Sequence, residues 1–383
     1  MTETKPVSRL AYVDGLRALS ALWVILYDVW RFNREPDLGL LTPLCASGHL
    51  GVEIFMVLSG FCLFYPMAHL WRLPAGHWRT FFVRRAKRIL PPYYAALLYA
   101  IVLPHAIAPL FTLAGLRFTP EALPSAWSLF VHVTMLQNLV DLPALINPSF
   151  WSLSLEAQYY LVFPLLALAI LRWRWKGVLA ILAFCGLYRL GFLAFLGSNL
   201  SRQEFLLFNS IVGRLAIFTA GMVVALVIRE TGGKRPEGLL DTLWGLSTVP
   251  LVMLGFYWYF HPVGAWPLSD VCLGVAAGGI LLRHADGARG LGRALAWPAL
   301  VSLGEMSYSF YLINRPTCYY VNHAVSQLVP GSQALQMGVT LAVGVPLSLA
   351  IAAGFYRWVE RPFMVRRPRP ELRARPVSTV PSS

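Results

Sequence analysis

The feature that most constrains this chain is a succession of apolar runs long enough to cross a lipid bilayer. A transmembrane helix needs about 20 mainly apolar residues. Ten runs approach or exceed this length, and no strand-like alternation or internal repeat is present. The sequence therefore predicts an all-α, polytopic membrane protein with about ten transmembrane helices. The predicted spans are 12–31, 49–70, 91–113, 150–171, 177–197, 205–228, 239–260, 268–282, 298–325 and 335–356.

The composition supports a membrane protein over a soluble one. Of the 383 residues, 57% are hydrophobic and 13% are charged, whereas soluble domains carry roughly 25% charged residues. The net charge of +14 comes from short basic clusters between the apolar runs. We therefore expect a lipid bilayer, and no nucleic acid, among the partners of this chain.

The basic residues also predict how the chain is oriented. With ten spans and both termini cytoplasmic, 24 of the 32 lysines and arginines fall on the cytoplasmic side and four on the outer side. Such an asymmetry is typical of multi-pass proteins of the inner (cytoplasmic) membrane. The first ten residues are polar and the run after them is too long for a cleavable signal peptide, so we expect an anchored first span.

The chain reads as one membrane-embedded domain, 1–364, followed by a basic, proline-rich cytoplasmic tail, 365–383, which we expect to be disordered. The apolar stretch 127–140 is bounded by prolines and is predicted to be interfacial or re-entrant. The five cysteines contain no CxxC pair, and four lie in apolar runs, which favours free, buried thiols. The histidines show no ligand spacing, so no metal site is expected.

The first predicted span carries charged residues. Asp28 follows Arg17 by eleven residues, which places both on one helix face, about 16 Å apart along the axis. A charge this deep in a membrane normally faces a cavity or a partner. The predicted orientation puts five polar residues in one outer layer: Asp28, Glu53, Glu156, Asn314 and Arg315.

Two interpretations of this layer remain open. The residues could form structural pairs, for example Arg315 with Glu156, or they could line a functional pocket that includes Ser59 and Ser152. The cluster Arg84, Arg85 and Arg88 is likewise open to two interpretations. In the first, the cluster has no role beyond fixing the orientation of the chain in the membrane. In the second, its guanidinium groups bind the phosphates of an anionic cofactor.

Six segments of the chain form recognisable motifs, and they begin at Asp14 (DGLRAL), Gly51 (GVEIFMVLSGF), Arg84 (RRAKRILPP), Phe150 (FWSLSLE), Ser307 (SYSFYL) and Val359 (VERPF). Taken in this order, they resemble the motifs of the acyltransferase 3 family of membrane O-acyltransferases. The resemblance implies a ten-helix bundle that transfers an acyl group from acyl-CoA to a hydroxyl of a sugar or secondary metabolite. A homodimer is a possible assembly.

This chain departs from the family pattern where the chemistry is expected. In the family, a basic residue is followed, after ten residues, by a histidine that acts as the base; here these positions are Arg17 and Asp28. A usual pair of glutamates is replaced by Glu156 and Ala157, and a usual histidine by Asn314.

The residue pattern and the resemblance together give three predicted sets of site residues. The catalytic set is Asp28, Glu156 and Arg17. The cofactor-binding set is Arg84, Arg85 and Arg88. The substrate-binding set is Glu53, Ser59, Ser152, Tyr159, Asn314 and Arg315.

Three functions fit these residues. The first is an O-acyltransferase with Asp28 as the base. The second is a repurposed enzyme, which would use buried Asp28 as a general acid or base to isomerise or cyclise a lipophilic substrate without acyl-CoA. The third is a non-catalytic relative that binds or exports a lipid-like molecule.

Overall fold

The computed structural model describes residues 10–70, 73–140, 145–196, 210–232, 246–248, 250–255, 257, 266–284 and 290–364. Every regular element in these ranges is a helix. The main helices are α1 (Ala11–Phe32), α2 (Thr42–Ala46), α3 (Gly51–Phe64), α4 (His77–Leu113), α5 (Ala126–Val133), α6 (Trp151–Trp173), α7 (Trp175–Leu196), α9 (Ile211–Glu230), α11 (Trp266–Arg283), α12 (Leu291–Leu295), α13 (Pro298–Glu305), α14 (Ser307–Leu328) and α15 (Gln333–Phe355).

The all-α prediction is confirmed for the described residues, and five helical stretches are long and apolar enough to cross a membrane. These stretches are Gly39–Phe64, His77–Leu113, Pro148–Trp173, Ile211–Glu230 and Gln333–Phe363. α1 has the length of a span but carries four charged residues. A count of ten spans and cytoplasmic termini stay predictions. The predicted span 239–260 lies largely outside the described residues, as does the tail 365–383.

Two predicted spans differ in their limits from the helices. The third was predicted to begin at residue 91, but α4 begins at His77 and includes the basic cluster. Hydropathy detects only the part of a helix that meets lipid, whereas arginine and lysine are good helix formers and extend it. The predicted span 298–325 is divided at Met306 into α13 and α14.

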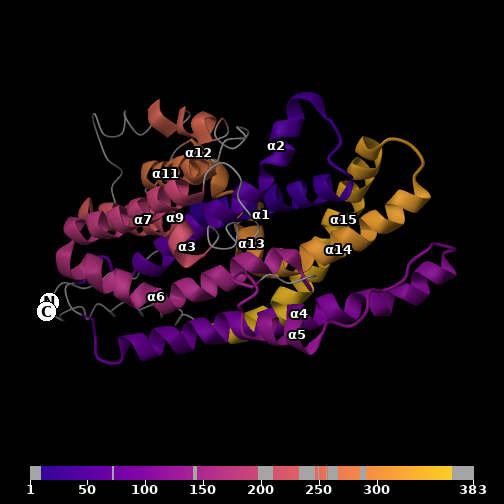
Figure 1. Cartoon of the computed structure of the whole chain (residues 1–383), viewed down its shortest axis with the longest axis horizontal. Helices are drawn as coiled ribbons and strands as arrows, with labels where there is room; N and C mark the ends of the chain where they lie inside the picture. Colours follow the sequence, from indigo (N-terminus) through magenta and orange to yellow (C-terminus); the bar gives the residue numbers. More distant parts are fainter. Residues whose placement is uncertain are drawn as a thin grey trace, which may run out of the picture.

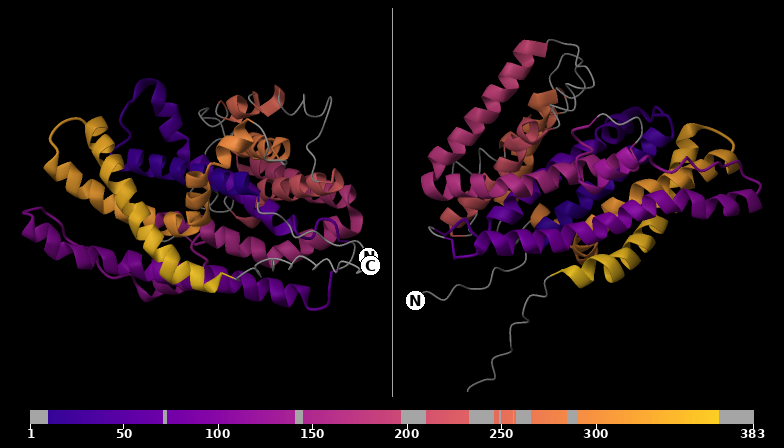
Figure 2. Two further views of the ribbon diagram at one scale, coloured as in Figure 1. Left: turned by 180° about the vertical axis from the view of Figure 1, so that it is seen from behind. Right: turned by 60° about the horizontal axis from the view of Figure 1, so that its bottom comes forward.

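α1 lies in the interior of the bundle, where it packs against α3, α13 and α14. α3 packs along α9, and α14 packs along α15. α4 runs along one side of the molecule (Figures 1 and 2). α5 is fastened beside it, because the hydroxyls of Tyr93 and Tyr94 donate to the carbonyls of His132 and Val133.

α3 and α9 approach each other closely at two glycines. A Cβ atom on Gly60 would lie 2.0 Å from the carbonyl oxygen of Phe218, and one on Gly221 would lie 1.9 Å from that of Val57. In a membrane, small residues at helix contacts let the two backbones pack directly. The two glycines therefore fix the position of the α3 face that carries Ser59 and Cys62.

We predict that Gly60→Ala and Gly221→Ala each destabilise the protein by about 1–3 kcal/mol, because the added methyl group overpacks this crossing. Gly186→Ala is the matched control, since Gly186 lies in α7 with open space around the Cβ position. The thermal unfolding midpoint in detergent should fall for the first two variants only. Equal midpoints for all three would contradict the packing argument.

Candidate functional site

The main candidate site is a cavity enclosed by α1, α3, α4, α6 and α14. Its empty volume is about 790 Å³, including open solvent at its mouth. The lining residues are Arg17, Val52, Phe55, Met56, Leu58, Ser59, Cys62, Leu63, Arg85, Arg88, Ile89, Ser152, Leu153, Glu156, Tyr160, Ser307, Tyr308 and Tyr311. The lining therefore combines seven apolar side chains with charged and hydroxyl-bearing ones, and polar groups that converge on a pocket fix the orientation of a ligand.

One face of α6 supplies the carboxylate of the cavity. Ser152, Glu156 and Tyr160 are spaced by four residues, so their side chains leave the helix in the same direction. Glu156 Oε1 accepts hydrogen bonds from the Tyr160 hydroxyl at 2.6 Å and from Ser59 Oγ of α3 at 2.9 Å. These two donors hold the carboxylate in place at the cavity wall.

Three arginines face this carboxylate across the same cavity. Arg85 and Arg88 lie three residues apart on α4, on one face of the helix, and Arg17 comes from α1. Arg17 Nε donates to Ser307 Oγ at 3.2 Å, and the Arg85 guanidinium lies 5.7 Å from the ring centre of Tyr160. Three guanidinium groups against one carboxylate leave a net positive lining, which suits an anionic ligand.

The arginines of the predicted basic cluster point in different directions from α4. Arg85 and Arg88 line the cavity, whereas Arg84 is exposed and lies outside its lining. Consecutive residues on a helix are turned about 100° apart, so neighbouring arginines cannot all face one pocket. The structure therefore brings two members of the predicted cofactor set together with Arg17 and leaves the third at the surface.

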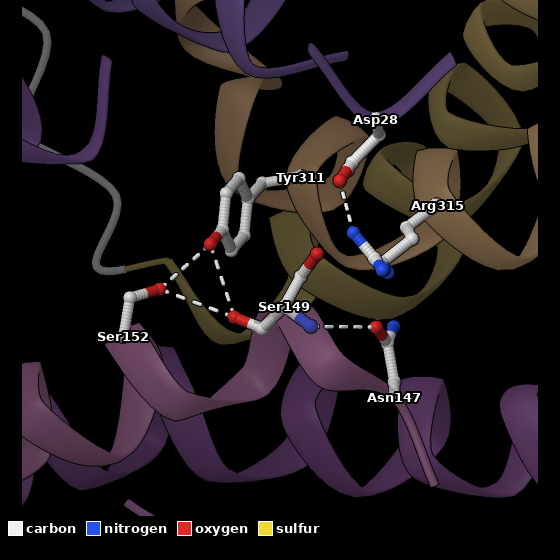
Figure 3. A network of polar contacts seen from close by, with 6 residues as sticks. All are labelled: Asp28, Asn147, Ser149, Ser152, Tyr311 and Arg315. Atoms are coloured by element: carbon white, nitrogen blue, oxygen red, sulfur yellow. Dashed lines mark hydrogen bonds and ion pairs between the residues drawn. The ribbon is translucent and has the colours of Figure 1, made fainter. Parts of the chain in front are cut away.

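Asp28 is buried, with 2% of its surface exposed, and forms an ion pair with Arg315 of α14 (Figure 3). The Arg315 guanidinium also lies 5.3 Å from the ring centre of Phe32. Neither Asp28 nor Arg315 lines the cavity. The pair of Arg315 with Glu156 that was offered as an example does not form, because Arg315 pairs with Asp28 instead.

Tyr311 lies at the cavity wall close to this ion pair (Figure 3). Its hydroxyl donates to the carbonyl of Ser149 at 3.0 Å and lies 2.7 Å from Ser152 Oγ. Asn147 in turn accepts from the backbone N–H of Ser149 at 3.0 Å. The network ties α14 to the start of α6, with Asp28 and Arg315 beside it.

The other predicted substrate residues lie away from the cavity lining. Glu53 pairs with Arg214 of α9, whose guanidinium lies 5.2 Å from the ring centre of Trp151. The Tyr159 ring stacks on Phe218 at 4.6 Å. Asn314 is buried within α14. Of the predicted substrate set, the cavity gathers Ser59 and Ser152.

The sequence reasoning missed several cavity residues, chiefly Cys62, Tyr160, Tyr308 and Tyr311. Helical spacing offered a signal for two of them: Cys62 follows Ser59 by three residues, and Tyr160 follows Glu156 by four. The tyrosines of α14 gave no such signal, because their direction depends on how α14 packs. In the described ranges, no group of three or more His, Cys, Asp or Glu side chains could hold a metal ion.

We predict a strong energetic coupling between Asp28 and Arg315. Removing one member of a buried ion pair strands the other charge, at a cost of about 3–5 kcal/mol. Asp28→Asn and Arg315→Gln should therefore each lower the thermal unfolding midpoint. The double variant should lose much less than the sum of the two single losses; simple additivity would show that the pair is not coupled.

Comparisons with known proteins agree with the resemblance. The chain matches the family described as "Acyltransferase domain" over residues 10–357. It is 23% identical, over 94% of its length, to "Putative O-acetyltransferase SACOL0978" of Staphylococcus aureus (strain COL), of which the match covers 58%. It is 28% identical, over 42% of its length, to "Peptidoglycan O-acetyltransferase OatA" of Listeria monocytogenes, of which the match covers 24%. The chain thus spans less than two thirds of these relatives, and no solved structure matches it.

Proposed function

Because the chain belongs to the acyltransferase 3 family, we propose that it is a multi-pass membrane enzyme that transfers an acyl group from acyl-CoA to a hydroxyl group. The single observation that carries the proposal is the cavity itself, where three arginines and one carboxylate converge. The arginines suit the phosphates of the donor, and the carboxylate suits the removal of a hydroxyl proton.

The donor end of the cavity is formed by Arg17, Arg85 and Arg88. Guanidinium groups bind phosphate oxygens through paired, charge-assisted hydrogen bonds, which a diphosphate such as that of CoA can satisfy. In the predicted topology, the first turns of α4 lie at the cytoplasmic side, where acyl-CoA is made available. The apolar lining, which includes Val52, Met56 and Leu63, would receive the acyl chain.

We assign the proton-accepting role to Glu156 instead of Asp28. A general base must come within hydrogen-bond reach of the proton that it removes. Glu156 lines the cavity, whereas the carboxylate of Asp28 is engaged with Arg315 behind the cavity wall. In this mechanism Glu156 takes the proton of the acceptor hydroxyl, the oxygen attacks the thioester carbonyl, and CoA leaves as the thiolate. Asp28 and Arg315 keep α1 and α14 in register.

We propose a sugar hydroxyl as the acceptor. One named relative is a peptidoglycan O-acetyltransferase, and the cavity offers Ser152, Tyr308 and Tyr311 as polar groups for a hydroxylated ligand. The test is an assay of the purified protein in liposomes with radiolabelled acetyl-CoA and a chitin oligosaccharide as the acceptor probe, with labelled oligosaccharide as the product. Failure to label this probe or a peptidoglycan fragment, with no release of free CoA, would contradict the proposal.

Glu156→Gln should lower kcat by about 10²–10⁴-fold, as expected for the loss of a general base, while the thermal unfolding midpoint changes little. Asp28→Asn should instead affect stability more than rate. We expect a large loss of stability and a smaller loss of kcat in the fraction that remains folded. Asp28→His should not raise the rate, because position 28 lies behind the wall. A faster Asp28→His enzyme would return the catalytic role to that position.

CoA should stabilise the wild-type protein against thermal unfolding, because a ligand that binds only the folded state raises its stability. Arg88→Ala should lose most of this shift. Arg84→Ala is the matched control on the same helix, and it should keep the shift because its side chain lies outside the cavity. Equal behaviour of the two variants would exclude the cavity as the donor site.

A further inference from the structure

We propose that Tyr160 is a positioning residue that joins the donor side of the cavity to its proton-accepting side. Its hydroxyl fixes the carboxylate of Glu156, and its ring supports the guanidinium group of Arg85. The inference rests on the proposed acyl transfer. It adds to that transfer which oxygen of Glu156 takes the proton, and which side chain places the carboxylate and the arginine together.

The hydroxyl of Tyr160 acts on one of the two carboxylate oxygens of Glu156. Oε1 accepts from the Tyr160 hydroxyl at 2.6 Å and from Ser59 Oγ at 2.9 Å. Two donors occupy both lone pairs of this oxygen. Oε2 accepts no hydrogen bond from any residue that the structure describes. Because Glu156 lines the cavity, Oε2 is the oxygen that is left to take a proton from a bound hydroxyl group.

The ring of Tyr160 faces a cation of the proposed donor site. The guanidinium carbon of Arg85 lies 5.7 Å from the ring centre of Tyr160 and 5.8 Å from that of Phe81. Aromatic rings at this range attract a guanidinium group through the cation–π interaction. Within the described ranges, Arg85 makes no hydrogen bond or ion pair, so the N–H groups of its planar fork stay available for phosphate oxygens.

The ring of Tyr160 is itself held firmly. Tyr160 is 8% exposed, and Phe81 meets its ring edge-on, with 6.2 Å between the ring centres and 84° between the planes. Phe81 in turn stacks on Phe163 at 5.2 Å. A tyrosine has only two side-chain torsions, so its ring and hydroxyl move together. One side chain therefore sets the carboxylate and the arginine relative to each other, as the reaction of a bound donor with a bound acceptor requires.

The proton then follows a defined route. Oε2 of Glu156 takes the proton of the acceptor hydroxyl, and the oxygen of that hydroxyl attacks the carbonyl carbon of the thioester. The carbon–sulfur bond of acyl-CoA breaks, and the proton passes from Oε2 to the sulfur of the departing CoA. Tyr160 keeps its own proton throughout, since it acts only on the position of Glu156.

The experiment compares Tyr160→Phe and Tyr160→Leu in the whole protein in liposomes, with acetyl-CoA and the chitin oligosaccharide probe. Tyr160→Phe keeps the ring and removes the hydroxyl. It should lower kcat by about 10–10²-fold, because a misplaced reacting group loses rate on this scale, while the KM for acetyl-CoA stays unchanged. Tyr160→Leu removes both ends. It should lower kcat in the same way and also raise the KM for acetyl-CoA by about 3–10-fold through the lost cation–π contact.

A double-variant cycle tests whether the hydroxyl acts through Glu156. In the Glu156→Gln background, Tyr160→Phe should cause no further fall in kcat, because the group that it positions is already absent. Ser59→Ala should resemble Tyr160→Phe, with a lower kcat and an unchanged KM for acetyl-CoA. A purely structural tyrosine would lower kcat by the same factor in both backgrounds.

Tyr99→Phe is the matched control. The Tyr99 hydroxyl lies 2.8 Å from Thr317 Oγ1, and the residue is on α4 outside the cavity lining. Its kcat and its KM for acetyl-CoA should equal those of the wild type. A thermal shift with CoA shows that each variant is folded and binds the donor. If Tyr160→Leu does not fold, Tyr160→Phe, Ser59→Ala and the cycle decide the question.

The outcomes separate this inference from the proposed function. If the wild-type protein acetylates the probe but Tyr160→Phe does so at the same kcat, or if Tyr160→Phe raises the KM for acetyl-CoA as much as Tyr160→Leu does, the two-ended role of Tyr160 is overturned and the transferase function stands. If the wild-type protein neither releases CoA nor labels an acceptor, the proposed function itself fails.

Discussion

The cost of placing charge inside a low-dielectric bundle controls this structure. A charged side chain within a membrane helix must be paired, or must face a cavity that contains water or a ligand. Both solutions occur here. Asp28 pairs with Arg315, and Glu53 pairs with Arg214. The carboxylate of Glu156 faces a cavity together with three arginines.

This division separates residues that hold the helices from residues that are available for chemistry. The two ion pairs join α1 to α14 and α3 to α9, so their charges are used in packing. The cavity charges join no helices through such an ion pair, and Arg88 is held in the cavity lining by the negative charges of Glu360 and Glu156. The polar groups available to a ligand are therefore those of the cavity. For that reason an aspartate at position 28 is compatible with an active enzyme, since the carboxylate of Glu156 lies in the cavity.

The cavity depends in turn on the close contact of α3 with α9. Because Gly60 and Gly221 let the two backbones meet, α3 is held with Ser59 toward α6, where its hydroxyl reaches Glu156. The same orientation turns Cys62 toward the arginines of α1 and α4. One helix crossing thus sets both the hydrogen bonding of the carboxylate and the environment of the thiol.

The sequence by itself determined the helical class, the position of most long helices and the family. It also predicted Arg17, Arg85, Arg88 and Glu156 as site residues, and all four line the cavity. These follow from local properties: run length, helical spacing and motif order. It named Glu156 as an example partner for Arg315 and did not find Asp28, because that pairing depends on how far α14 is rotated about its own axis.

Only the tertiary structure decided which polar residues meet. Arg84, Glu53 and Tyr159 were predicted as site residues but lie outside the cavity lining. The lining includes Cys62, Tyr160 and Tyr311, which were not predicted. The physical reason is that depth in a membrane can be estimated from position along one helix, whereas the direction of a side chain is fixed by contacts between helices distant in sequence, such as the crossing at Gly60 and Gly221.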